Sequence, residues 1–176
     1  MKNDDDKLRN LLSVINKNKE HLEPWLRPSI IYFRNFVESI EDLKRHFNKN
    51  MCYIISQNKN IIGCIDFSKL NIDEKKLSFR IINYWIDKNY ARKGIMFKCL
   101  GKLEKIFMDY ELDYILARIE EINEPSINLI KKLGFMEDSI IGFYVDEDAG
   151  KSVDIIEFKK TYRKNMEHEI KYGLYK

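Results

Sequence analysis

A strand–loop–helix step over residues 77–110 carries the first pattern in the sequence that could bind a ligand. An apolar, aromatic-rich strand ends at Trp85-Ile86, a short loop carries Arg92-Lys93-Gly94, and a helical apolar period begins near Ile95. The first amides of a helix lack intrahelical partners, and together with the helix dipole they favour an anion such as a pyrophosphate. Gly94 would let an anion approach the backbone closely. The loop is therefore a candidate phosphate site, although an ordinary loop with two solvated cations fits the same pattern.

A second strand-to-helix junction lies at Asn123-Glu124-Pro125-Ser126. Pro125 suits the first turn of a helix, where its missing N–H removes no hydrogen bond. Asn123 then sits at the junction itself, where its side chain can either cap the helix or hydrogen-bond a ligand. Taken alone, this segment favours the simple cap.

Apolar periodicity along the chain predicts how these two segments are positioned. Helical spacing predicts helices over 3–22, from Ser39 to about 47, over 96–110 and over 126–133, the last ended by Gly134. Short apolar runs predict strands over 52–56, 61–67, 77–86, 114–119, 140–145 and 153–158. The polar turn Asn58-Lys59-Asn60 would join the first two strands as a hairpin. The predicted order is ααβββαβαββ, a mixed α/β sheet.

Composition and charge exclude several classes of protein. The chain has 176 residues, of which 44% are apolar and 12% aromatic, as in a globular domain. Thirty-one basic and 28 acidic residues leave a net charge of +3, which argues against nucleic acid or an anionic membrane as partner. The acidic N-terminus and the lack of any apolar window of about 20 residues predict a cytoplasmic protein. We expect a single domain over residues 1–160, followed by a basic tail or helix over 161–176.

Metal-ligating residue types are scattered along the sequence. No pair of cysteines has metal-ligand spacing, and an odd number of them does not suggest a disulfide framework. The histidines are also isolated from one another. The residues concerned are Cys52, Cys64, Cys99, His21, His46 and His168. We expect no metal.

The two ligand-binding segments, in their order and spacing, resemble the cofactor-binding half of GNAT acetyltransferases, and most closely the branch that acetylates the N-termini of ribosomal proteins. The resembling residues are Asn83-Tyr84-Trp85-Ile86-Asp87, Ala91-Arg92-Lys93-Gly94-Ile95-Met96, Ala117-Arg118-Ile119, Asn123, Ser126 and Lys132-Leu133-Gly134-Phe135; upstream they include Asn18, His21-Leu22, Trp25-Leu26 and Ile62-Gly63-Cys64-Ile65-Asp66-Phe67. The likeness covers roughly residues 4–160. It implies an α/β fold with a mixed, mostly antiparallel twisted sheet flanked by helices.

The resemblance implies direct attack of a primary amine on the thioester of acetyl-CoA, with no metal. The strand ending at Tyr84-Trp85-Ile86 would pair through its backbone with the pantetheine arm, and Asn123 and Ser126 would flank the sulfur. Trp25 and Tyr84 would line the acceptor pocket. The pyrophosphate would lie on the amides of Arg92, Lys93, Gly94, Ile95, Met96 and Phe97.

The catalytic groups follow from the pKa of the acceptor amine. An α-amino group with a pKa of ~7.7–8.0 is roughly a tenth neutral at neutral pH, whereas a lysine amine near ~10.4 is almost wholly charged. A site without an evident carboxylate base therefore favours a protein N-terminal α-amine. Glu120, at the end of strand 114–119, is the candidate base, with a solvated charge as the alternative. Ser126 is the candidate acid for the thiolate, with a plain helix-end hydroxyl as the alternative.

Four departures from the family pattern matter. Ala91 replaces the first residue of the phosphate loop, the tyrosine that many members use as general acid would fall at Ile130, and a carboxylate of the fourth strand would fall near Ile81. The usual first strand is missing, which leaves a sheet edge open and makes a homodimer a possible state.

Two alternatives to an N-terminal acetyltransferase stay open. The first is acetylation of a small amine, a polyamine or an aminoglycoside; a polycation would need an acidic pocket, for which Glu38, Glu41, Asp42 and Asp66 are the candidates. The second is a non-catalytic acyl-CoA-binding module, which the missing tyrosine and carboxylate would allow.

Overall fold

A computed structural model of the chain describes residues 2–22, 25, 39–73, 76–109, 112–146 and 150–162. The elements are α1 (Lys2–Lys17), α2 (Lys19–Leu22), α3 (Ile40–Lys49), β1 (Met51–Gln57), β2 (Asn60–Asp73), β3 (Lys76–Ile86), the 3-10 helix η2 (Lys88–Tyr90), α4 (Ile95–Met108), β4 (Leu112–Glu120), α5 (Glu124–Lys132), β5 (Met136–Asp146) and β6 (Lys151–Thr161). This order confirms the predicted one, with the short α2 and η2 added.

The strands form one six-stranded sheet in the order β1-β2-β3-β4-β6-β5. All neighbours are antiparallel except β3 and β4, which run parallel. β1 and β2 are joined by a two-residue turn in which Asn58 and Lys59 both have positive φ, 49° and 67°. That is the conformation of a type I′ turn, whose twist matches that of the flanking strands. The predicted hairpin is thus confirmed, with Asn60 as the first residue of β2.

The N-terminal helix is interrupted at Asn18, which the apolar period did not reveal. The Asn18 side chain donates to Val14 O at 2.9 Å, and the backbone carbonyl of Asn18 accepts from the amides of His21 and Leu22. An asparagine side chain that bonds to nearby backbone competes with the helical pattern. α1 therefore ends at Lys17, and a separate short helix, α2, begins at Lys19.

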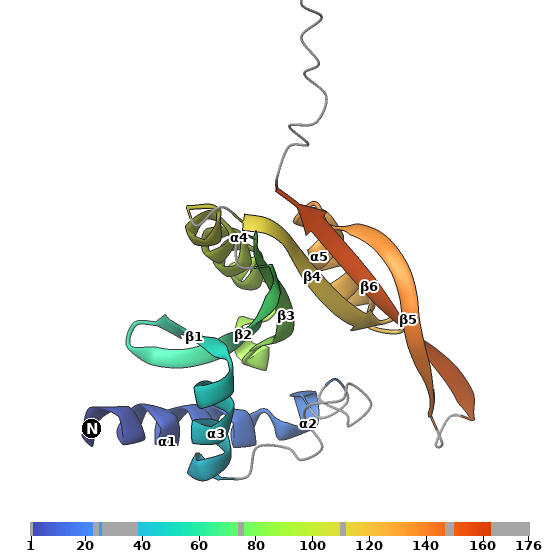
Figure 1. Cartoon of the computed structure of the whole chain (residues 1–176). Helices are drawn as coiled ribbons and strands as arrows, with labels where there is room; N and C mark the ends of the chain where they lie inside the picture. Colours follow the sequence, from blue (N-terminus) through green and yellow to red (C-terminus); the bar gives the residue numbers. More distant parts are fainter. Residues whose placement is uncertain are drawn as a thin grey trace, which may run out of the picture.

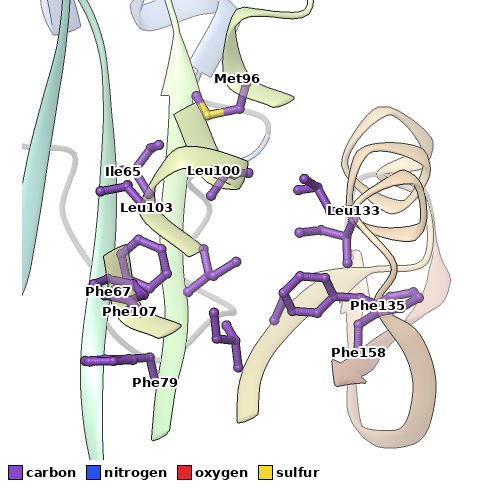
Figure 2. Packing of buried hydrophobic residues seen from close by; sticks show 14 of the residues in the cluster. Ile65, Phe67, Phe79, Met96, Leu100, Leu103, Phe107, Leu133, Phe135 and Phe158 are labelled. Carbon is purple, nitrogen blue, oxygen red and sulfur yellow. The ribbon is translucent and has the colours of Figure 1, made fainter. Parts of the chain in front are cut away.

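Two apolar clusters cover the two faces of the sheet. On one face α1 and α3 pack on β1–β3 through Leu11, Leu43 and Trp85. On the other face α4 and α5 pack over the sheet centre, where the Phe107 ring stacks on Phe79 at 4.3 Å and meets Phe67 edge-on at 4.9 Å (Figure 2). These helices place their N-termini beside the centre of the sheet, where the functional site lies.

The outer strands of the sheet bear on two of the predictions, the missing first strand and the limit of the domain. β1 forms one edge of the sheet, as expected if the usual first strand is missing. β5 forms the other edge, and its hairpin with β6 extends past the end of β4 (Figure 1). β6 runs to Thr161, one residue beyond the predicted domain limit, while residues 163–176 lie outside the described residues.

No described helix is both long and apolar enough to cross a membrane; the cytoplasmic location stays a prediction.

Candidate active site

The sheet opens between β3 and β4. The two strands pair from Leu77 and Leu112 as far as Ile81 and Ala117, and β4 continues beside β6 alone. Figure 1 shows the two strands side by side at one end and diverging towards the other. Among the described residues, the β4-facing edge of 82–86 therefore has no strand partner. Backbone N–H and C=O groups left in this way are available to a ligand that lies between the strands.

A β-bulge marks the point at which the strands separate. Asp66 pairs with Asn83 and Phe67 with Ile81, so that Ile82 is an extra residue in β3. A bulge bends its strand and increases the local twist. Because Ile82 directly follows the last residue paired with β4, the bend accounts for the divergence.

The loop after β3 leads into the uncapped N-terminus of α4. Gly94 occupies the N-cap position with φ +71°, and it offers no side-chain cap. The first helical hydrogen bond runs from Lys98 N to Gly94 O, so the amides of Ile95, Met96 and Phe97 precede it. Arg92 also has a positive φ, 59°. A run of amides at a helix start with alternating left-handed residues is the arrangement that binds phosphate oxygens.

The cations of this loop are arranged differently from the sequence-based expectation. The ammonium of Lys93 donates to Asn89 O at 2.8 Å and lies 5.4 Å from the Tyr90 ring centre. It is thus engaged with η2, while Arg92 is exposed. Met96 is part of the core, and Ile95 and Phe97 pack against it, so these three residues have only backbone groups to offer an anion.

A buried polar network anchors the base of the same loop. Asn18 is 1% exposed, and its side-chain oxygen accepts from the amide of Lys88 at 3.0 Å. Asp87, 4% exposed, accepts from the amide of Asn89 at 2.8 Å and lies 3.6 Å from the Lys17 ammonium. The network ties the end of α1 to the start of the loop. In the sequence, only the family resemblance pointed to Asn18, and the spacing of Asp87 to Asn89 was the available sign of a cap.

The charge of Asp87 is expected to stabilise the fold in a pH-dependent way. Burial alone raises the pKa of Asp87, but the Asn89 amide, the Asn18 side chain and the Lys17 charge together lower it below the ordinary 3.8. Because the folded pKa is the lower one, the stabilisation is complete above the ordinary value and is lost as pH falls through the folded pKa. Urea unfolding should therefore find Asp87→Asn less stable than the native protein at neutral pH, with a gap that narrows below about pH 4.

The matched control for this measurement is Asp6→Asn, which changes an exposed carboxylate on α1. Its stability should follow that of the native protein at every pH. A gap for Asp87→Asn that stays constant down to acid pH would contradict the role of the charge.

The second predicted segment forms a tight junction between β4 and α5. Asn123 caps α5, its Oδ1 accepting from the amide of Ser126 at 3.2 Å, and its own amide donates to Glu120 O at 2.9 Å. Pro125 lies in the first turn of the helix, as predicted. Glu120 is 3% exposed, and its Oε2 accepts from the Tyr144 hydroxyl at 2.9 Å. Glu120 is therefore a buried, hydrogen-bonded carboxylate, and the solvated charge is excluded. Tyr144, its partner on β5, gave no signal in the sequence.

Tyr84 links the two sides of the opening. Its side chain leaves β3 on the α4–α5 face, and its hydroxyl donates to Ser126 O at 3.5 Å. Burial, partly offset by the hydrogen bond to Ser126, raises the pKa of Tyr84 to about 12. The phenol therefore stays protonated at neutral pH. Hydrogen bonds thus link Tyr84 to Ser126, Ser126 to Asn123, and Asn123 to the backbone carbonyl of Glu120, across the two segments of chain that border the opening.

Comparisons with known proteins decide the family. The profile of the Acetyltransferase (GNAT) family matches residues 11–135. The chain belongs to the GNAT acetyltransferase family. It is 25% identical over 132 residues, 74% of this chain and 72% of the relative, to the uncharacterized N-acetyltransferase p20 of Bacillus licheniformis.

Solved structures share the fold of this GNAT protein. The ribosomal-protein-S5-alanine acetyltransferase of Vibrio fischeri superposes with a TM-score of 0.68 at 22% identity, over 89% of this chain and 88% of that one. The microcin C7 self-immunity acetyltransferase MccE, solved with acetyl-CoA and AMP, gives a TM-score of 0.68 at 18% identity, over 90% and 88%. The family makes the chain an acetyl-CoA-dependent acetyltransferase.

The remaining predicted residues of this GNAT acetyltransferase have different surroundings. The Trp85 side chain is buried in the core against α1 and α3, so only its backbone can reach a cofactor. Ile86 packs against the core of the other face. Ile130 and Ile81, at the positions of the family tyrosine and carboxylate, are buried core residues. Trp25 is 39% exposed, and the residues on either side of it lie outside the described ones.

Proposed function

We propose that residues 2–162 form one acetyltransferase domain that transfers an acetyl group from acetyl-CoA to a protein N-terminal α-amine. The observation that carries the proposal is the opening between β3 and β4, flanked by the uncapped start of α4 and by the β4–α5 junction. Together these features offer backbone groups for an extended pantetheine arm, amides for a pyrophosphate and polar side chains where the thioester would lie.

Each part of acetyl-CoA has a proposed set of partners. The pyrophosphate lies on the amides from Arg92 to Phe97, where the charge of the α4 dipole is positive. The pantetheine arm follows the unpaired edge of 82–86, which includes the backbone of Tyr84, Trp85 and Ile86. The sulfur then lies near Ser126, whose hydroxyl protonates the departing thiolate.

The acceptor follows from the chemistry of the junction. Its buried carboxylate, Glu120, takes the proton that the protonated amine must lose before it attacks the thioester carbonyl. A single carboxylate base suits an α-amine, which is already partly neutral at neutral pH, better than a lysine amine. The Vibrio fischeri structural relative, named for the acetylation of a ribosomal-protein alanine, supports the same acceptor class. Trp25 and Tyr84 remain the proposed walls of the acceptor pocket.

The acids that would form a pocket for a polycation have other partners. Asp42 accepts from Ser39 in the cap of α3 and pairs with Arg45. Asp66 is buried beside Cys64 and His46. Glu41 is exposed on α3, and Glu38 lies outside the described residues. These surroundings favour a protein N-terminus over a polyamine.

The test is release of free CoA thiol from acetyl-CoA with three acceptors. They are a peptide with a free N-terminal alanine, the same peptide with its N-terminus acetylated and one internal lysine, and spermidine. We expect turnover with the free N-terminus alone. Turnover with spermidine alone would make the protein a small-amine acetyltransferase. No turnover despite acetyl-CoA binding, with a panel of N-terminal residues, would favour a non-catalytic acyl-CoA-binding module.

A homodimer through β5 is also proposed. This edge strand exposes apolar side chains that proteins normally cover, and exposed edges pair readily with a second strand. The residues are Met136, Ile140, Ile141, Phe143 and Val145, between 40% and 72% exposed. Antiparallel pairing of β5 with itself would form a two-fold interface. Sedimentation should give a dimer for the native protein and a monomer for Phe143→Lys. Met108→Lys, which changes an exposed residue of α4, should remain a dimer. A native monomer would contradict the proposal.

A further inference from the structure

A buried cluster of metal-ligating side chains lies between α3 and the β1–β2 hairpin. His46 comes from α3, Cys52 from β1 and Asp66 from β2, and one ligand atom of each lies within 4.8 Å of the others. His46 Nε2 and Asp66 Oδ2 lie 3.2 Å apart. Cys52 faces the α1–α3 side of the sheet, opposite the side on which α4 packs, so the cluster is separate from the acetyl-CoA site.

The strand register brings these residues together. Cys52 and Asp66 are direct partners in the antiparallel β1–β2 pair. Cys64 precedes Asp66 by two residues, so its side chain lies on the same face of β2. Its Sγ donates to Asp66 Oδ1 at 3.2 Å. The two carboxylate oxygens therefore have different partners, one held by Cys64 and the other facing His46.

Without a bound cation, burial of these polar and charged side chains destabilises the fold. The side chains of Asp66 and His46 are only 5% and 14% exposed, and a buried carboxylate destabilises a fold unless it is paired or bound to a cation. Thiols are weak hydrogen-bond donors to such a carboxylate.

We propose that His46, Cys52 and Asp66 bind a divalent transition-metal ion, with Zn²⁺ as the best match. Imidazole, thiolate and carboxylate are the ligands of protein zinc sites, and in a tetrahedral site with bonds of about 2.0–2.3 Å the ligand atoms lie about 3.3–3.8 Å apart. The 3.2 Å between His46 and Asp66 is close to the lower end of this spacing, and the Cys52 sulfur lies within 4.8 Å of both ligand atoms. Cys64 orients the carboxylate through its second oxygen.

The ion would link three elements of the fold. α3 contributes one ligand, and the paired strands β1 and β2 contribute the other two. On binding, Cys52 loses its proton to solvent and becomes the thiolate ligand. No electron transfer is involved. Because β1 is an edge strand among the described residues, the ion would fix α3 to this edge of the sheet.

The test uses the whole purified protein, stripped with a chelator and reloaded with Zn²⁺ or Co²⁺. We expect about one metal ion per chain by elemental analysis and, with Co²⁺, a thiolate-to-cobalt charge-transfer band. Cys52→Ser should lose the band and His46→Gln should bind at least about 100-fold more weakly. Cys64→Ser should keep the band with weaker binding. Cys99→Ser, which changes a half-buried thiol of the other core cluster, should behave as the native protein.

A thermal measurement on the native chain avoids dependence on the variants' folding. Adding Zn²⁺ in excess should raise the Tm of the native protein, since an ion that binds only the folded state stabilises it by mass action. It should leave the Tm of folded Cys52→Ser unchanged. Failure of the native protein to take up metal, or uptake that survives in Cys52→Ser, would overturn the proposal and leave the cluster as a His46–Asp66 pair.

Discussion

Gly94→Glu is expected to lower the affinity for acetyl-CoA by at least about 100-fold in isothermal titration. The proposed pyrophosphate lies on amides next to this residue, and a carboxylate about 5 Å from even one phosphate charge costs about 3 kcal/mol at a protein surface. The substitution is tolerable to the fold, because a Cβ at Gly94 meets no atom within 4 Å. The left-handed φ of +71° adds about 1–2 kcal/mol of backbone strain.

Gly94→Gln is the matched control for this prediction. Glutamine brings the same bulk and the same strain without the charge, so we expect it to lose no more than about tenfold in affinity. Since surface charges are screened by salt, the difference between the two variants should shrink as ionic strength rises. Native-like binding by Gly94→Glu would show that the pyrophosphate lies elsewhere than at the start of α4.

The elements of the fold were predictable because local signals agree with one another. The six strands and the long helices follow from apolar periodicity, and Ser39 caps α3 together with Asp42 as a capping box, where a helix start was predicted. Strand limits were less accurate: β2, predicted over 61–67, runs over Asn60–Asp73. The break at Asn18 was missed because apolar periodicity does not register side-chain hydrogen bonds, and the second partner of this side chain, the amide of Lys88, lies 70 residues away. Such a partner is invisible to any local window.

In the candidate site, too, local features were predictable from the sequence and long-range partners were not. The loop at Gly94 and the junction at Asn123 were predictable, because each is a turn formed by adjacent residues of the chain. The partner of Glu120, Tyr144, comes from a different strand and was not. From their spacing the cysteines and histidines were expected to be isolated, yet His46 and Cys52 lie in one cluster with Asp66, which is 3.2 Å from His46. Pairing of β1 with β2 places Cys52 opposite Asp66, and α3 adds His46, so the cluster depends on contacts between separate elements.

Glu120→Gln is expected to lower kcat by at least about 100-fold while leaving the affinity for acetyl-CoA unchanged. Glutamine has the shape of glutamate and can still accept from the Tyr144 hydroxyl, but it cannot take a proton from the attacking amine. This prediction rests on the proposed transfer to an α-amine. The matched control is Glu121→Gln, since Glu121 is exposed and accepts from the amide of Asp154, outside the proposed site. Its kcat should stay close to that of the native enzyme.

The pH dependence separates a catalytic from a structural role for Glu120. At neutral pH roughly nine-tenths of the acceptor α-amine carries a proton that a base must remove, whereas well above its pKa of about 8 the amine is already neutral. If Glu120 removes that proton, the loss of kcat/KM in Glu120→Gln should shrink as pH rises through the pKa of the acceptor amine. A buried carboxylate that only holds Tyr144 in place would give a loss of the same size at every pH, and that result would remove Glu120 from the mechanism.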